Sequence, residues 1–150
     1  MAPHKPYIAI INGPNLNLIG KRNTAVYGKK SLSDYLKNFQ AKSDIALHLF
    51  QSNIEGELVD EVQKHGYQPN CIGIVLNAAA YSHYSIAIAD AVEAIKFPVV
   101  EVHISNIFAR EPFRHHSCIS AFASAVIAGC GLVGYELAVK YLLNLTKEEG

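Results

Sequence analysis

The chain has 150 residues, of which half are apolar and 17% are charged, and its 13 acidic and 13 basic side chains cancel at pH 7. This length suits one domain with a single core, and the balanced charge excludes the strongly basic surface that nucleic acids and anionic membranes attract. The apolar runs fall short of the about 20 residues needed to span a bilayer, and residues 1–6 are not followed by a signal-like apolar stretch. We therefore expect a cytoplasmic protein that binds neither nucleic acid nor membrane.

Apolar runs and helical spacings alternate along the chain. In order, they predict a strand at 7–11, a helix from Ser31 or Ser33 to near Ser43, a strand at 45–50, a helix at 54–65, a strand at 72–76, a helix around 86–95, strands at 99–103 and 121–128, and a helix at 135–145. Uninterrupted apolar strands are typical of a parallel sheet buried on both faces. The pattern predicts an α/β fold, a doubly wound, five-stranded parallel sheet of the flavodoxin-like kind in a single domain.

The glycines and the one long loop carry further predictions. Residues 15–30 show no regular period, and we expect a mobile lid over about 18–30, because long loops in compact domains are usually functional. Gly66 is a natural left-handed terminator for the helix at 54–65. The glycines at 129, 131 and 134 follow the last strand without an acidic ribose partner, so we interpret them as a tight turn with close helix packing and not as a dinucleotide site.

Cysteine and histidine spacing gives no sign of a metal centre. The three cysteines, Cys71, Cys118 and Cys130, are widely spaced and form no C-x-x-C pair, so we expect buried thiols and no disulfide or zinc site. His103, His115 and His116 have no carboxylate at ligand spacing. We therefore expect no bound metal.

Polar residues follow three of the predicted strands. Asn12 and Asn15 follow the first, a stretch from Asn77 to His83 follows the third, and His103 and Ser105 end the fourth. Because ligands of open α/β sheets bind at the carboxyl ends of the strands, these side chains predict one polar pocket. A set of cationic and imidazole side chains able to hold an anion comes next: Arg110, Arg114, His115 and His116.

Several ordered motifs, spread over nearly the whole chain, resemble the type II 3-dehydroquinate dehydratase family. They are INGPNLNL at 11–18, Arg22, Tyr27 with Gly28, LNA at 76–78, His83, EVHISN at 101–106 and ARE at 109–111. Members of that family are flavodoxin-like, use no cofactor, assemble as dodecamers and eliminate water in trans from 3-dehydroquinate, through an enolate, to give 3-dehydroshikimate. The resemblance thus implies a cofactor-free hydro-lyase, with residues 1–150 as one catalytic domain, in a homododecamer built from trimers.

The resemblance also implies a role for each matching residue. Tyr27 would take the C2 proton as tyrosinate, held ionised by Arg22, and His103 would protonate the departing hydroxyl. Asn15, with a bound water near the Asn77 loop, would help to stabilise the enolate. The resemblance implies that the substrate's hydroxyls and carboxylate are bound by Asn77, His83, Ile104, Ser105 and Arg114, the last as a bidentate fork. Asp90 would reach the site of a neighbouring subunit.

One departure from the family and one competing class remain. Asn23 and Thr24 stand where the family usually has Glu and Pro, which leaves the loop more conformations to lose on closing.

The competing class is a binding module. A receiver domain needs clustered Asp at the end of the first strand, where this chain has Asn12 and Asn15, and a flavin or nucleotide binder needs a phosphate loop where it has Pro14. Aromatic biosynthesis by the shikimate pathway and quinate breakdown use the same reaction, and both stay open.

Overall fold

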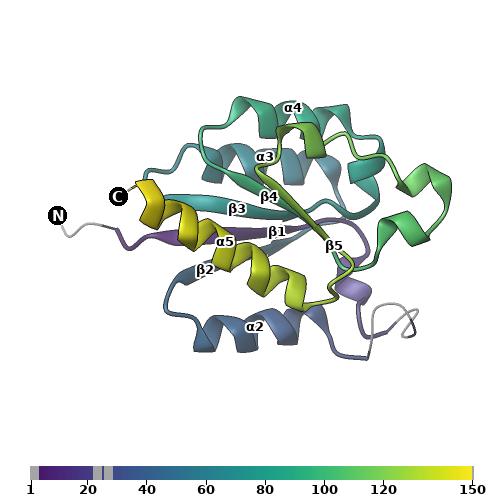
Figure 1. Cartoon of the computed structure of the whole chain (residues 1–150), viewed down its shortest axis with the longest axis horizontal. Coiled ribbons are helices and arrows are strands. Elements are labelled where there is room, and N and C mark those ends of the chain that lie inside the picture. The colour runs from purple at the N-terminus through teal and green to yellow at the C-terminus, as the bar shows by residue number, and fades with distance from the viewer. Residues whose placement is uncertain (1–3, 22–24, 26–28, 150) are drawn as a thin grey trace.

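The computed structural model describes residues 4–21, 25 and 29–149, and its middle layer is a five-stranded parallel sheet (Figure 1). The strands are β1 (Tyr7–Asn12), β2 (Ala46–Gln51), β3 (Cys71–Asn77), β4 (Val99–His103) and β5 (Ala125–Ala128). Their spatial order is β2-β1-β3-β4-β5, and every neighbouring pair is parallel. This is the flavodoxin-like order, in which the direction of winding reverses between β1 and β3. The predicted fold class is confirmed.

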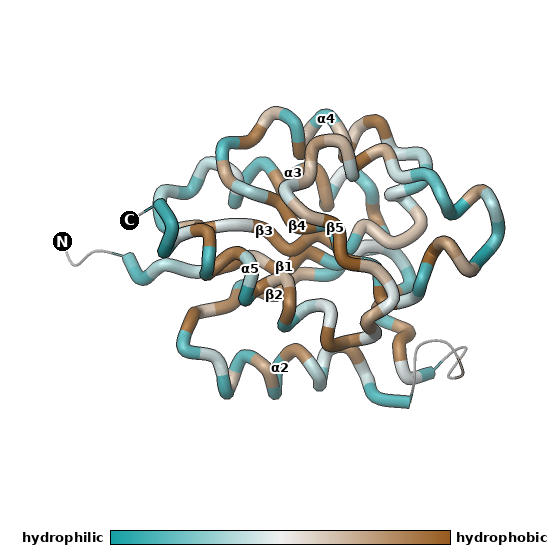
Figure 2. The backbone as a smooth tube through the Cα atoms, viewed as in Figure 1, coloured by the Kyte–Doolittle hydropathy of each residue, from teal (hydrophilic) through white to brown (hydrophobic). Residues whose placement is uncertain are grey.

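Helices cover both faces of the sheet. They are α2 (Leu32–Lys42), α3 (Glu55–Gly66), α4 (Ile86–Ala94) and α5 (Val133–Glu149). α2 and α5 pack on one face, while α3 and α4 pack on the other (Figure 1). The side chains of β1 alternate between these two faces of the sheet. Ile8 and Ile10 face α2 and α5, whereas Ala9 and Ile11 face α3 and α4, and all four are fully buried. In Figure 2 the sheet is accordingly brown and apolar in the centre of the molecule.

Local signals gave the boundaries of α2 correctly. The Ser31 hydroxyl caps the helix by accepting a hydrogen bond of 3.2 Å from the backbone N–H of Asp34, and Ser43 follows the last turn. The predicted strand at 121–128 is too long, because a short 3₁₀ helix at Ser120–Phe122 takes its first residues. Helix α5 is longer than predicted at both ends.

Two predictions about small residues were wrong. Gly66 is the last residue of α3 and is not among the described residues with a left-handed backbone. It is glycine because a Cβ there would lie 2.3 Å from Cγ2 of Ile95, where α3 packs against the chain after α4. Of the cysteines, Cys71 is buried as expected, Cys118 is half-buried and Cys130 is exposed in the turn after β5.

The turn after β5 supports the end of β4. Gly129 and Gly131 have φ of 88° and 63°, which confirms the predicted tight turn. Their backbone N–H groups donate to the carbonyl oxygens of His103 and Ile104 at 3.2 and 3.0 Å. The glycine motif therefore fixes the strand end that carries the predicted pocket residues.

The stretch at 15–30, for which no regular structure was predicted, begins with a short 3₁₀ helix, Leu16–Leu18. Arg22, Asn23, Thr24 and Tyr27 lie outside the described residues, so the lid prediction remains a prediction. In the part of the chain that the structure does describe, no helix has the length and apolar character needed to cross a membrane.

Candidate active site

A cleft opens at the carboxyl ends of β1, β3 and β4, with about 640 Å³ of empty space including its open mouth. Most of the predicted site residues line it: Asn15, Asn77, His83, His103, Ile104, Ser105 and Arg114. Pro14 and Arg110 share the lining. Arg22 and Tyr27 lie outside the described residues, and Asp90 is exposed on α4, away from this cleft. The polar ends of three strands thus meet as the topology requires.

The loops after β1 and β3 hold one another in place. The backbone N–H of Gly13 donates to the carbonyl oxygen of Asn77 at 2.7 Å, and a Cβ on Gly13 would lie 2.5 Å from the carbonyl oxygen of Ala78. Only glycine allows this approach. Asn15 then takes a left-handed conformation with φ of 67°, which asparagine tolerates, and its N–H donates to Oδ1 of Asn53 at 2.9 Å.

A buried network fixes the amide of Asn77. Its Nδ2 donates to the phenol oxygen of Tyr135 at 2.9 Å, and its Oδ1 accepts from the N–H of Ala79 at 3.1 Å. The Tyr135 hydroxyl donates in turn to Oδ1 of Asn12 at 2.6 Å. Burial raises the pKa of Tyr135, so the phenol keeps its proton and the direction of these bonds is fixed. The amide of Asn77, which lines the cleft, is thereby held in one orientation.

Glu101 is a functional residue to which the sequence analysis gave no role. It lies in the middle of β4 and is fully buried, and its Oε2 accepts a hydrogen bond of 2.5 Å from Nε2 of His103. Its other oxygen accepts from the hydroxyls of Ser117 and Ser120 at 3.0 and 2.8 Å. A charged residue inside an apolar strand, two positions before a histidine, was the signal available in the sequence, since both side chains then lie on the same face.

The surroundings of Glu101 keep it ionised. Burial acts to raise its pKa, but hydrogen bonds from His103, Ser120 and Ser117, with the charge of His103, outweigh burial and lower the pKa below its ordinary value. The carboxylate therefore holds the proton on Nε2 of His103. Nδ1 remains as the ring nitrogen that can exchange a proton with a ligand.

His83 is held as a neutral ring beside His103. Its Nδ1 donates to the backbone carbonyl of His116 at 2.8 Å, and the two imidazoles stack with centroids 6.1 Å apart. Burial lowers the pKa of His83, and the positive charges of His103 and Arg114 lower it further, against the effect of the His116 carbonyl. A neutral imidazole with Nδ1 occupied offers Nε2 as an acceptor for a ligand hydroxyl.

Two arginines give the cleft its positive charge. Nε of Arg114 donates to Oε2 of Glu111 at 2.8 Å, and Nε of Arg110 lies 3.9 Å from the same oxygen. The Nε edge of Arg114 is thus engaged, and its terminal Nη groups form the fork that a carboxylate can meet. Together with a carboxylate-held imidazole and fixed amide donors, this suits acid–base chemistry on a small, hydroxylated carboxylic acid.

Comparison with known proteins agrees with this chemistry. The family described as "Dehydroquinase class II" matches residues 6–143. The chain is 49% identical to the 3-dehydroquinate dehydratase of Bacillus subtilis, over 93% of this chain and 95% of that one. It is 46% identical to the "Catabolic 3-dehydroquinase" of Emericella nidulans, over 90% and 89% of the two chains. The structure is similar to that of type II dehydroquinase from Butyrivibrio crossotus, with a TM-score of 0.86, 38% identity and coverage of 92% and 97%.

Proposed function

The chain belongs to the class II dehydroquinase family, and from this membership and the chemistry of the cleft we propose that it is a 3-dehydroquinate dehydratase. The reaction removes water from 3-dehydroquinate by trans elimination and gives 3-dehydroshikimate. The observation that carries the proposal is the Glu101–His103 pair, buried at the end of β4 in the cleft that Asn15, Asn77 and Arg114 also line.

In the proposed mechanism the elimination has two steps. Tyr27, ionised beside Arg22, takes the proton from C2, and the electron pair of the broken C–H bond forms an enolate with the neighbouring ketone. The C–O bond to the departing hydroxyl then breaks as the enolate collapses to a conjugated enone, while Nδ1 of His103 gives that oxygen a proton and water leaves. The proton on Tyr27 must return to His103 before the next cycle.

The remaining residues would hold the substrate in the orientation that this elimination needs. The Nη groups of Arg114 bind the carboxylate, while Asn77, His83, Ser105 and the backbone of Ile104 bind hydroxyl groups. Asn15, with a bound water, stabilises the enolate oxygen as a neutral donor and so does not trap the anion. The fixed amide of Asn77 and the neutral ring of His83 support this division of roles.

The direct test is incubation of the purified protein with 3-dehydroquinate. The product is a conjugated enone, so absorbance in the ultraviolet should rise with time, without added cofactor. Absence of turnover by a folded protein would contradict the proposal. The same assay at limiting and saturating substrate gives kcat and KM for the variants below.

Two substitutions test the acid and the base separately. Tyr27→Phe and His103→Ala should each lower kcat by about 10²–10⁴-fold, because each removes a group that moves a proton. Tyr67→Phe is the matched control, since that exposed residue does not line the cleft, its hydroxyl donates to the carbonyl of Ala94 at 2.7 Å, and its loss should leave kcat unchanged. A folded Tyr27→Phe protein with near-normal turnover would refute the assignment of the base.

We further propose that the chain assembles as a homododecamer built from trimers and that Asp90 completes the site of a neighbouring subunit. Large apolar side chains exposed on this chain support an assembly: Tyr84, Ile86, Phe108, Phe113 and Val126. Asp90→Ala should raise KM, whereas Glu93→Ala, on the same exposed side of α4, should not. Light scattering gives the mass in solution, and a fully active monomer would overturn the proposal.

A further inference from the structure

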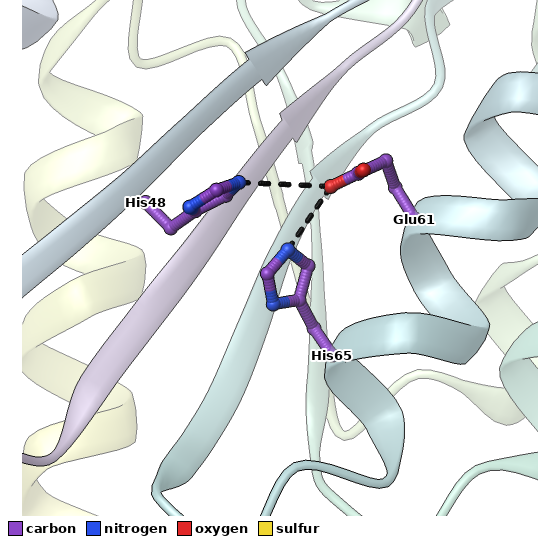
Figure 3. Close-up of side chains that lie close together, drawn as sticks. All are labelled: His48, Glu61 and His65. Atoms are coloured by element: carbon purple, nitrogen blue, oxygen red, sulfur yellow. Dashed lines mark hydrogen bonds and ion pairs between the residues drawn. The ribbon is translucent and has the colours of Figure 1, made fainter. Parts of the chain in front are cut away.

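A second cluster of ionisable side chains lies away from the cleft, on the α3 side of the sheet (Figure 3). His48 comes from β2, and Glu61 and His65 come from successive turns of α3. Oε2 of Glu61 lies 3.0 Å from Nε2 of His65 and 3.7 Å from Nε2 of His48. The three side chains converge on one point, where both imidazoles present Nε2 to the same carboxylate oxygen (Figure 3).

We propose that His48, Glu61 and His65 form a binding site for a divalent transition metal ion, with Zn²⁺ as the best fit. Zinc takes imidazole nitrogen at about 2.0–2.1 Å and carboxylate oxygen at about 2.0–2.2 Å, so two ligand atoms of a tetrahedral site lie about 3.3–3.4 Å apart. The observed spacings of 3.0 and 3.7 Å fall on either side of this value. The three ligand atoms all lie within 4.8 Å of one another.

Tyr7 provides the outer hydrogen bond that such sites use to orient a histidine ligand. Its hydroxyl lies 2.6 Å from Nδ1 of His65, on the far side of the ring from Glu61. When Nε2 of His65 binds a metal, the ring proton resides on Nδ1 and is donated to the Tyr7 oxygen.

The cluster has a route for the ion and a place for a fourth ligand. The side chains of His65 and Glu61 are 3% and 13% exposed, whereas that of His48 is 42% exposed and forms the open side. His48 and His65 line a surface hollow, which His4 and Asn70 line as well. Lys64 lies 3.6 Å from Oε1 of Glu61, the oxygen that faces neither histidine, so the carboxylate would bind the ion through Oε2 alone. Three protein ligands and a water make a tetrahedral set.

The site differs from the expectation of no metal drawn from the sequence. Glu61 and His65 are four residues apart on one helix face, but His48 belongs to a strand, and only the packing of α3 against the sheet brings the three side chains together. The hollow and the active-site cleft share no lining residue. His65 lies in the last turn of α3, away from the carboxyl ends of the strands where the cleft opens. Zinc should therefore stabilise the fold without changing turnover.

The test measures zinc binding to the metal-free protein by calorimetry and by its melting temperature. One Zn²⁺ should bind per chain, and free zinc at about a hundred times Kd should raise the melting temperature by about 5–10 °C. Co²⁺ should give the visible absorption of a tetrahedral nitrogen and oxygen site. Because His48 is partly exposed, His48→Ala should fold normally, and both it and Glu61→Gln should weaken binding by at least about tenfold.

Two matched variants separate this site from adventitious binding. Lys64→Ala, next to the cluster, should keep or tighten zinc binding, because it removes a positive charge near Glu61. His116→Ala removes an exposed imidazole whose Nε2 lies 3.9 Å from the thiol of Cys118, and it should leave the affinity for zinc unchanged. The inference is overturned if zinc causes no thermal shift, if binding survives both His48→Ala and Glu61→Gln, or if bound zinc inhibits turnover at one equivalent.

Discussion

Replacing Glu101 with glutamine removes the negative charge beside His103 while it preserves the size of the side chain. In the wild-type chain the carboxylate accepts the Nε2 proton of His103 and the hydroxyls of Ser117 and Ser120. Glutamine offers one acceptor oxygen in place of two. It must either present its NH₂ group to the imidazole, which favours the wrong tautomer, or give up bonds to the serines.

The magnitude follows from the hydrogen bond that is lost. A hydrogen bond to a charged group contributes about 1.5–3 kcal/mol, which corresponds to a factor of about 10 to 100. Because the proposed reaction needs His103 to be held in place as the acid, kcat should fall by about that factor, less than the loss expected for His103→Ala. KM should change little, since Glu101 is fully buried behind the histidine.

The assay measures kcat and KM of each variant through the absorbance of the enone. Ser120→Ala is the graded control, because it removes one of the bonds to Oε1 and leaves the charge. Circular dichroism and a melting curve establish that each variant is folded.

One outcome would refute the reasoning directly. If folded Glu101→Gln keeps the wild-type kcat, the carboxylate has no part in holding the acid. A rise in KM with unchanged kcat would also refute it. That result would assign Glu101 to substrate binding, whereas its fully buried side chain should make no contact with a substrate.

The remaining predictions concern stability and are read from urea denaturation. Tyr135→Phe should cost about 1–3 kcal/mol, because it leaves the buried oxygen of Asn12 without its donor at 2.6 Å, and a loss below about 0.5 kcal/mol would mean that water replaces the phenol. Gly66→Ala should cost about 1–3 kcal/mol through overlap with Ile95. Gly56→Ala in the same helix, where a Cβ meets nothing within 4 Å, should stabilise by about 0.5–1 kcal/mol, and equal effects at the two glycines would contradict the packing argument.

Local patterns determined the order of elements and the edge of the sheet that carries the cleft. Apolar runs such as 99–103 are short, and a helix separates most of them, which leaves few alternatives to a doubly wound sheet. Asn77 and His103 stand where strands end, and the carboxyl ends of parallel strands must meet at one edge. The Ser31 cap was also predictable, because capping depends on residues within one turn.

The family motifs identified site residues that hydrophobic periodicity alone could not. They associated Asn15, His83 and Arg114 with one reaction before any geometry was known, and these side chains do line one cleft. They also assigned Tyr27 and Arg22, which lie outside the described residues, and Asp90, whose proposed role requires a second subunit.

Only the tertiary structure decided which side chains pair across the fold. Glu101 is a charged residue in an otherwise apolar strand. The groups that keep it ionised are His103 on the same strand and the hydroxyls of Ser117 and Ser120, which come later in the chain. His48 meets Glu61 and His65 because α3 packs against the sheet on the face where the His48 side chain lies. Sequence periods of 2 and 3.6 residues say which face a side chain occupies, but its partner is set by how separate elements pack, and that information is not local.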